Sequence, residues 1–215
     1  WSRGLGDVYK RQKYNSFFHT DAVQAVGHYK VDLKSFNIHF LSSAAHKFHG
    51  PKGVGFTFIN KSIKIKSFIC GGPQERGLRA GTESVHNIVG MTKALEIAER
   101  KMEQESRYVL SIKEYMIESL RKLFPDIHFN GESGNIKNST YTILNVCFPL
   151  SNDKAAMLDF NLDLRGIACS KGSACQSGSS DGSHVLSEIQ SEDKKKFPSV
   201  RFSFSHNNKM DEVDY

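Results

Sequence analysis

The segment from Ile38 to Ile59 constrains the fold of this chain more than any other part of the sequence. Two short apolar runs, 38–41 and 55–59, flank a glycine-rich stretch that contains Lys47. Short apolar runs bounded by glycine and proline are typical of strands, and a return after so few residues favours an antiparallel neighbour. We therefore expect an α/β sheet with an antiparallel member, in which Lys47 lies near the backbone at the end of a strand.

A lysine in that position suits the chemistry of pyridoxal 5'-phosphate (PLP), which needs an amine to form a Schiff base with the cofactor. The same chemistry needs an acid that keeps the pyridine nitrogen protonated, because the cationic ring withdraws electrons from the substrate. Asp21 ends the preceding apolar run, 17–21, and we expect it at the same edge of the sheet as Lys47. A lone lysine is ordinarily a solvated surface charge, so this interpretation depends on the pairing with Asp21.

Four segments contain more extended patterns. In chain order they are HTDAVQAVG (19–27), AAHKFHGPKGVG (44–55), GGPQERGLRAGT (71–82) and CSKGSAC (169–175). Together they resemble successive signatures of the cysteine desulfurases, the NifS/IscS-like branch of the class V aminotransferase family of PLP enzymes. The resemblance implies an α/β PLP-dependent transferase fold of the aspartate aminotransferase-like kind (fold type I), with a partial large domain and a small α/β domain.

The resemblance and the hydrophobic periodicity together divide the chain into four parts. Residues 1–12 show neither a strand nor a helix period, and we interpret them as a non-native leader. Residues 13–90 are expected to form the C-terminal part of the PLP-binding large domain, and residues 91–124 a helical connector. Residues 125–215 are expected to form a small C-terminal domain, which we interpret as truncated.

Each part has predicted secondary structure. The expected elements are a short helix over 23–31, one long bent helix or two helices over 84–124, strands over 127–129, 140–146 and 199–204, a helix over 153–160, and a helix that begins near residue 209.

Composition narrows the class of protein. With 39% hydrophobic and 24% charged residues, the 215-residue chain has the profile of a soluble globular protein. No apolar run approaches the length of a membrane span and the start is not a secretory signal, so we expect a cytoplasmic protein. The formal net charge of +6 comes from scattered basic residues, with 194–196 the only tight run. That pattern favours a solvated face over a nucleic-acid site.

The resemblance assigns roles to five residues near the first domain's sheet. Lys47 is implied to bind PLP covalently, and Asp21 to pair with the pyridine nitrogen. Gln24 is implied to donate a hydrogen bond to the phenolate oxygen of the ring, and His46 to help hold the phosphate. Thr82 is implied to reach the phosphate bound by the partner subunit of a homodimer. Gln24 and His46 also suit a structural role at the end of a helix or strand, and both alternatives stand.

The phosphate site differs from the family pattern. Relatives typically carry a serine three residues before the lysine, whereas this chain has Ala44 there and Ser43 one place earlier. A hydroxyl is therefore lost or displaced, and we expect weaker binding of the phosphate. The glycine/threonine loop, the ring-stacking histidine and the asparagine that precede this region in full-length relatives are not found in residues 1–13.

Cys175 is the expected nucleophile. It lies among small residues, 171–180, which favour a mobile loop over a core. Mobility suits a thiolate that takes sulfur from the substrate as a persulfide and then delivers it to an acceptor. Cys70 and Cys147 lie in or beside apolar runs and are expected to be buried, and Cys169 is assigned a structural role. The four cysteines show neither a disulfide framework nor zinc-ligand spacing, so no metal is expected.

Arg201 is the expected anchor for the substrate carboxylate. An arginine flanked by apolar residues on a strand must reach solvent or bind an anion, and its planar fork matches a carboxylate. The resemblance implies the same role at this position.

We interpret the sequence as part of a cysteine desulfurase that converts L-cysteine to L-alanine and leaves the sulfur on Cys175. The resemblance implies a homodimer that serves a sulfur-acceptor or iron–sulfur scaffold protein, with neither nucleic acid nor membrane as a partner. One alternative is a selenocysteine lyase, which would use the same residues, or another class V aminotransferase. A transaminase has no use for the Cys175 loop. The second alternative is a non-catalytic interaction fragment that holds no cofactor.

Overall fold

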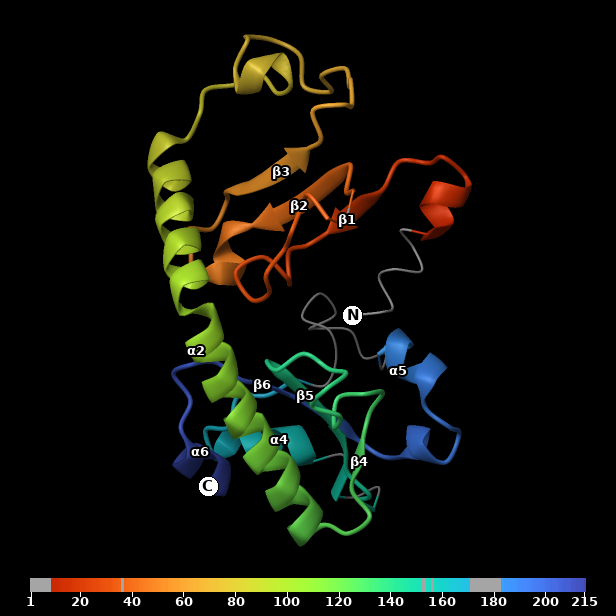
Figure 1. The fold of residues 1–215 in the computed structure, drawn as a ribbon. Helices are drawn as coiled ribbons and strands as arrows, with labels where there is room; N and C mark the ends of the chain where they lie inside the picture. Colours follow the sequence, from red (N-terminus) through yellow and green to blue (C-terminus); the bar gives the residue numbers. More distant parts are fainter. Residues whose placement is uncertain (1–8, 36, 152–153, 156, 171–182) are drawn as a thin grey trace. The chain divides into compact units, whose positions relative to one another are not determined.

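The computed structural model describes residues 9–35, 37–151, 154–155, 157–170 and 183–215 (Figure 1). The chain divides into two compact units, Trp1–Glu103 and Gln104–Tyr215. Helix α2 (Val85–Leu123) contributes residues to both units. None of the helices in the described part of the chain is long and apolar enough to cross a membrane.

The first unit contains a mixed three-stranded sheet. Its strands are β1 (His19–Asp21), β2 (Phe40–Ala44) and β3 (Gly55–Ile59), in the spatial order β1-β2-β3. β1 and β2 are parallel, whereas β2 and β3 are antiparallel. The α/β sheet with an antiparallel return is therefore confirmed, although β2 begins at Phe40 and continues to Ala44 instead of covering 38–41.

The short helix expected over 23–31 is wrong, because this stretch forms successive turns. Val26 N donates to Ala22 O at 2.9 Å in a helix-like bond, but Ala25 N donates to the same oxygen at 2.9 Å and shortens the turn. Gly27 then takes a φ of 83°, in the left-handed region, which ends any helical path.

The core of the first unit packs one face of the sheet against α2. Its buried residues are Ala22, Val26, Ile38, Leu41, Ala45 and Phe48, and the helix adds Met91, Ala94, Leu95 and Ala98. The helix residues recur at three- and four-residue spacing, which places them on one face of α2. The periodicity over 84–124 thus corresponds to one continuous helix of 39 residues.

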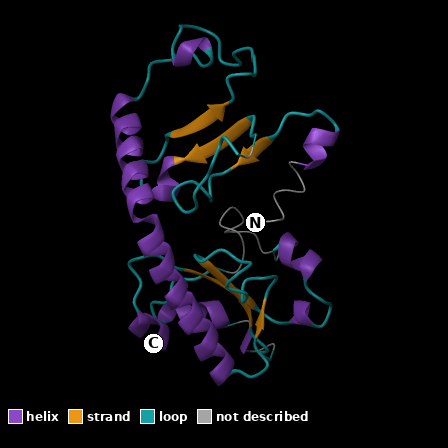
Figure 2. Cartoon of the chain, viewed as in Figure 1, coloured by secondary structure: helices purple, strands orange, loops and turns teal. Residues whose placement is uncertain are grey.

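The second unit contains an antiparallel sheet of β4 (His128–Phe129), β5 (Ile143–Cys147) and β6 (Ser199–Ser203), in the order β4-β5-β6 (Figure 2). The three strands occur where the apolar runs predicted them. The helices are α4 (Leu158–Leu164), α5 (His184–Ile189) and α6 (Met210–Asp214), with a 3-10 turn, η4, at Lys194–Lys196. The buried core comprises Ile117, Leu120, Ile127, Leu144, Val146, Phe148 and Val200.

Two expectations about local structure need adjustment, and a third is confirmed. Residues 9–13 are helical, although the sequence there showed no helix period. α4 begins at Leu158, later than the expected helix over 153–160, of which residues 153 and 156 lie outside the described residues. α6 begins at Met210, as expected for a helix near residue 209.

Lys113 is an unusual buried residue on the second half of α2. Its side chain has no exposed surface, and its Nζ donates to Ser139 Oγ and to Thr140 O, each at 2.7 Å. These bonds attach the loop before β5 to the helix. Burial disfavours the charged amine and lowers the pKa of Lys113 to about 8.

We expect this lysine to make stability depend on pH. Between the folded pKa of about 8 and the ordinary value of 10.5, the unfolded chain binds more protons than the folded chain, so the free energy of unfolding should rise with pH across that window. Below pH 8 the gain is absent, because both states are protonated. Urea unfolding of the wild type and of Lys113→Met from pH 7.5 to 10.5 measures the effect. The wild type should gain no more than about 3 kcal/mol relative to the variant. If the free energy of unfolding changed with pH equally in the two proteins, the prediction would be wrong.

Candidate functional site

The parallel pairing of β1 and β2 brings two predicted cofactor residues to one edge of the sheet. Asp21, the last residue of β1, pairs in register with Ser42. β2 ends two residues later, and the chain passes directly into η1 (Ala45–Phe48), a 3-10 turn that contains His46 and Lys47. Because the carboxyl ends of parallel strands lie at the same edge, the segments that bear Asp21 and Lys47 are neighbours. Lys47 thus lies in the turn after the strand.

Two buried residues fix the direction of this turn. Ala45 and Phe48 are 0% and 1% exposed, whereas His46 is exposed and Lys47 is half-buried. Ala45 also anchors the backbone, because its N–H donates to Val54 O at 3.0 Å and its carbonyl accepts from Gly50 N at 2.8 Å. The turn therefore presents its polar residues away from the core.

The segment after β1 is fastened to the same turn. His28 Nε2 lies 3.0 Å from the backbone oxygen of Lys47. A Cβ at Gly27 would lie 2.5 Å from Phe48 Cβ, so only glycine fits the close approach of the two backbones. The stretch that carries Gln24 and the turn that carries Lys47 are consequently held together.

The donors and acceptors at this edge are partly engaged. Asp21 is exposed, and its Oδ1 accepts a 2.9 Å hydrogen bond from Val23 N, which closes the turn after β1. Among the described residues, no hydrogen bond or ion pair involves Asp21 Oδ2, the Lys47 amine, the exposed Gln24 side chain or the His46 ring. One carboxylate oxygen and the lysine amine are therefore available to a ligand.

The structure shows on which face of β2 the hydroxyl of Ser43 lies. Successive side chains of a strand point to opposite faces, so Ser43 and Ala44 lie on different sides of the sheet. Ser43 is buried on the same face as Leu41, and its Oγ has no partner among the described residues. Ala44 lies on the other face, with Ser42 and Asp21. The hydroxyl of Ser43 therefore does not replace one at position 44.

Thr82 lies in the long connection between β3 and α2 and is exposed. The connection is organised by Gln74, whose Oε1 accepts from Gly81 N at 3.2 Å, and by Arg79, whose Nη1 donates to Ala80 O at 2.8 Å. In the described part of the chain, no hydrogen bond joins Thr82 to Lys47. The expected contact of Thr82 is with the phosphate bound by a partner subunit, and it stays a prediction.

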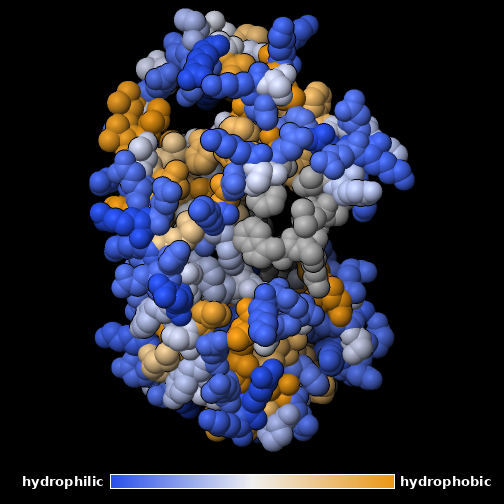
Figure 3. Space-filling model, viewed as in Figure 1, coloured by the Kyte–Doolittle hydropathy of each residue, from blue (hydrophilic) through white to orange (hydrophobic). Residues whose placement is uncertain are grey.

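This connection and the start of α2 expose an apolar surface. The exposed apolar side chains are Ile65, Phe68, Ile69, Leu78, Val85 and Val89. Phe68 is 99% exposed, and Figure 3 shows hydrophobic surface over the first turns of α2. Exposed apolar patches of this kind commonly mark interaction sites.

In the second unit, Arg201 lies on the edge strand β6, opposite Asn145 of β5. Its Nη2 donates to Ser170 Oγ at 3.4 Å, and its Nε is buried without a hydrogen-bond partner among the described residues. A buried donor without a partner costs stability, so an acceptor supplied by a ligand would be favoured there.

The expected nucleophile, Cys175, lies outside the described residues. Two other cysteines behave as expected: Cys147 is fully buried, and Cys169 packs half-buried against the core of the second unit. Burial raises the pKa of both thiols, and the charge of Asp163 raises the pKa of Cys169 further. Neither is favoured as a thiolate. Cys70 was expected to be buried, and that is wrong, because it lies exposed in the connection after β3.

A buried polar network, which no motif in the sequence indicated, joins the end of α5 to the sheet. Asn130 Nδ2 donates to Asn145 Oδ1 at 2.8 Å and to Ser199 Oγ at 2.9 Å. Gln190, the residue after α5, donates through Nε2 to Asn130 Oδ1 at 2.8 Å. Gln190 Nε2 also lies 3.1 Å from Ser199 Oγ, so the residue after α5 is attached to β6.

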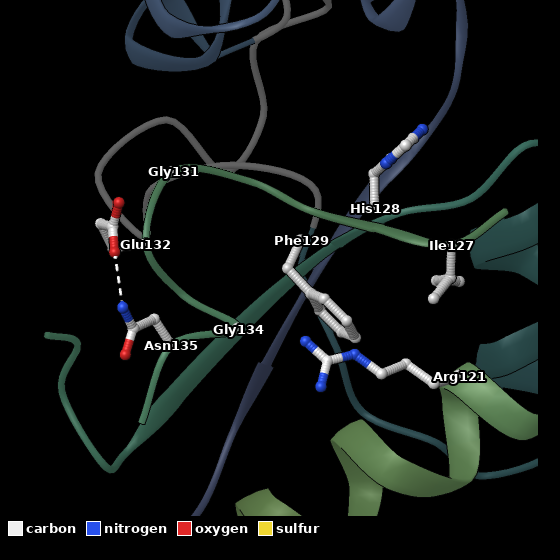
Figure 4. A pocket seen from close by; sticks show the side chains of 8 residues that line it. All are labelled: Arg121, Ile127, His128, Phe129, Gly131, Glu132, Gly134 and Asn135. Atoms are coloured by element: carbon white, nitrogen blue, oxygen red, sulfur yellow. Dashed lines mark hydrogen bonds between the residues drawn. The ribbon is translucent and has the colours of Figure 1, made fainter. Parts of the chain in front are cut away.

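A pocket of about 310 Å³ lies in the second unit and contains none of the predicted site residues. The guanidinium of Arg121 lies 5.4 Å from the centre of the Phe129 ring, and Asn135 donates to Glu132 at 3.0 Å (Figure 4). The side chain of His128 points away from Arg121 in this view. The polar groups do not converge on one point, so the pocket is not a strong candidate site.

Comparison with known proteins gives consistent results. The profile of the aminotransferase class-V family matches residues 4–215, a range that includes most of the expected leader. The cysteine desulfurase IscS of Clostridium botulinum is 39% identical over 211 residues, which cover 98% of this chain and 52% of the relative. The solved structure of a NifS-like protein has a TM-score of 0.78 and 32% identity, covering 96% of this chain and 51% of that one.

A second solved structure, titled SspA in complex with cysteine, has a TM-score of 0.66 and 27% identity, covering 94% of this chain and 54% of that one. The chain spans about half the length of the curated relatives it matches.

The close approach of Gly27 to Phe48 can be tested with a matched pair of variants. Gly27 and Gly53 have φ values of 83° and 82°, but a Cβ at Gly53 would meet nothing within 4 Å. Both alanine variants acquire the strain of a left-handed residue, and only Gly27→Ala adds the clash. We expect Gly27→Ala to lose about 1–3 kcal/mol more stability than Gly53→Ala in urea unfolding. Equal losses of stability in the two variants would show that Gly27 and Phe48 are not closely packed.

Proposed function

This chain belongs to the class V aminotransferase family, and from that premise we propose that it carries the cofactor lysine and the substrate arginine of a PLP-dependent cysteine desulfurase. The observation that supports the proposal most directly is the parallel register of β1 and β2, which brings the segments of Asp21 and Lys47 to one sheet edge. The PLP cofactor and the α/β fold are properties of the family. The activity, the substrate and the partners of the whole protein are our proposal.

The groups at this sheet edge fit PLP. The amine of Lys47 would hold the cofactor covalently, and the free carboxylate oxygen of Asp21 would accept a hydrogen bond from the protonated ring nitrogen. Gln24 and His46 would bind the ring oxygen and the phosphate. PLP supplies the electron sink that weakens bonds at the substrate Cα and Cβ. The phosphate site lacks a hydroxyl at position 44, and the Ser43 hydroxyl is buried on the other face.

Arg201 suits the carboxylate of an amino-acid substrate. In the described part of the chain, its buried Nε has no hydrogen-bond partner and its guanidinium forms no ion pair. Two parallel N–H donors of a guanidinium can bind a carboxylate at both oxygens. The cysteine in the SspA structure is an amino acid with such a carboxylate.

Cys175 would accept the sulfur. In the proposed reaction, the C–S bond of L-cysteine breaks, a bond forms between that sulfur and the Cys175 sulfur, and a proton is added to the carbon to give L-alanine. L-Cysteine plus the enzyme thiol thus yields L-alanine plus the enzyme persulfide, with no external oxidant. In the sequence Cys175 follows Ser170 by five positions, and Ser170 pairs with the backbone of Arg201.

A homodimer is part of the same proposal. Thr82 lies in the connection that, with the start of α2, exposes an apolar surface, and a partner subunit would cover it. The persulfide would pass to a sulfur-acceptor protein or an iron–sulfur scaffold protein. The cytoplasm is the proposed compartment.

The phosphate site is tested by exchanging hydroxyls between the two faces of β2. In the full-length protein that carries this chain, Ala44→Ser should tighten PLP binding about 3- to 10-fold, because it adds a donor on the face that holds Asp21. Ser43→Ala is the matched control and should leave PLP affinity unchanged, since it removes a buried hydroxyl from the opposite face. Fluorescence titration with PLP gives the dissociation constant of the wild type and of each variant. Weaker PLP binding by Ser43→Ala would mean that this hydroxyl serves the phosphate after all.

The proposed reaction separates cofactor binding from sulfur transfer. Lys47→Ala should lose the absorbance band of bound PLP. Cys175→Ser should keep that band and its shift on adding L-cysteine, but release at least about 100-fold less sulfide in the presence of a reductant, because only the sulfur acceptor is removed.

Cys169→Ser is the control and should retain sulfide release. A protein in which Cys169→Ser is inactive and Cys175→Ser still turns over would place the nucleophile on the other cysteine. A wild-type protein that binds PLP but releases no sulfide from L-cysteine would exclude the desulfurase assignment.

A further inference from the structure

Ser170 contacts Arg201 through three hydrogen bonds. Ser170 N donates to Arg201 O at 3.1 Å, and Arg201 N donates to Ser170 O at 2.7 Å. This reciprocal pair is an isolated antiparallel bridge on the open edge of β6. The third bond joins the side chains, from Arg201 Nη2 to Ser170 Oγ at 3.4 Å. The backbone pair fixes where the two residues lie, and the side-chain bond acts on the guanidinium alone.

The third bond pairs Arg201 with a neutral acceptor. A hydroxyl oxygen accepts a hydrogen bond without contributing a negative charge, so it orients the guanidinium and leaves its full positive charge for another anion. A carboxylate in the same place would neutralise Arg201. The residue opposite on β5 is Asn145, which is also neutral, and no acidic partner of Arg201 is found among the described residues.

The remaining donors of Arg201 are therefore pre-arranged. With Nη2 tied to Ser170, the buried Nε stays without a partner in the described part of the chain. A guanidinium held by one nitrogen loses less rotamer freedom when it binds an anion, and this reduces the entropic cost of binding.

We propose that Ser170 is a positioning residue for carboxylate recognition, whose hydroxyl orients the Arg201 guanidinium toward the α-carboxylate of the amino-acid substrate. This inference rests on the proposed function, because it takes Arg201 as the carboxylate receptor. Ser170 acts through Arg201 and is not assigned a contact with the substrate. Its hydroxyl can be removed without removing either backbone bond of the bridge.

The experiment compares two ligands that differ only in the carboxylate. Calorimetric titration of the full-length, PLP-loaded protein with L-alanine and with L-alaninamide gives a ratio of dissociation constants that measures carboxylate recognition. Ser170→Ala should lower the preference for L-alanine about 3- to 10-fold, the effect of losing one hydrogen bond, while L-alaninamide binding stays the same. Ser170→Thr keeps the hydroxyl and should keep the wild-type ratio.

Arg201→Gln completes the comparison. It should abolish the preference, and adding Ser170→Ala to it should change nothing further, because the serine acts through the arginine. An equal loss for both ligands in Ser170→Ala would indicate a purely structural role and overturn the proposal, as would an unchanged ratio. Thermal unfolding followed by circular dichroism checks that each variant is folded, and Ser170→Thr still tests the proposal if Ser170→Ala does not fold.

The outcomes for the two proposals are distinct. A wild-type protein that prefers L-alanine but releases no sulfide from L-cysteine would refute the desulfurase assignment and leave the positioning role supported. A wild-type protein that binds L-alanine and L-alaninamide equally would refute Arg201 as the receptor, and with it the role of Ser170.

Discussion

The candidate cofactor site depends on the close packing of Gly27 against Phe48. The ring of Phe48 fills the core of the first unit, and burying such a side chain contributes about 1.5–3 kcal/mol. Because Gly27 has no side chain, the backbone after β1 can approach Phe48 closely enough for His28 to reach the Lys47 carbonyl. This close approach holds the stretch after β1 against the turn that carries Lys47.

In the second unit, the fold orders the side chain of Arg201 although not all of its hydrogen-bond donors have partners among the described residues. Apolar neighbours alone would leave the guanidinium of Arg201 free to turn to solvent. Edge strand β6 instead receives Ser170 on its open side and is tied through Ser199 to the polar network of Asn130 and Gln190. Such a network stabilises only when its members are satisfied. Arg201 lies beside it on β6, and its buried Nε has no hydrogen-bond partner among the described residues.

Hydrophobic periodicity predicted most of the regular structure. The apolar runs located the strands of both sheets, and the three- and four-residue spacing identified α2, because those patterns follow directly from which face is buried. The pattern failed over 23–31, where apolar residues have near-helical spacing but a left-handed Gly27 interrupts the path. It failed for Cys70, since neighbouring apolar residues such as Phe68 are themselves exposed, so an apolar run did not mean burial. Ser170 lies in the CSKGSAC segment, but that pattern did not indicate its contact with Arg201, which spans 31 positions.

The adjacent positions 43 and 44 show why a residue type near a motif is weak evidence for its role. Moving a serine by one place along a helix rotates it by about 100°, and a side chain can often compensate. Along a strand the same shift sends it through the sheet to the opposite face. Ser43 therefore carries a hydroxyl but lies on the face opposite Asp21, and this buried hydroxyl, which has no partner among the described residues, is unfavourable there. Lys47 and Asp21 remain at the sheet edge because the strands' parallel register, rather than the phosphate contacts, determines their location.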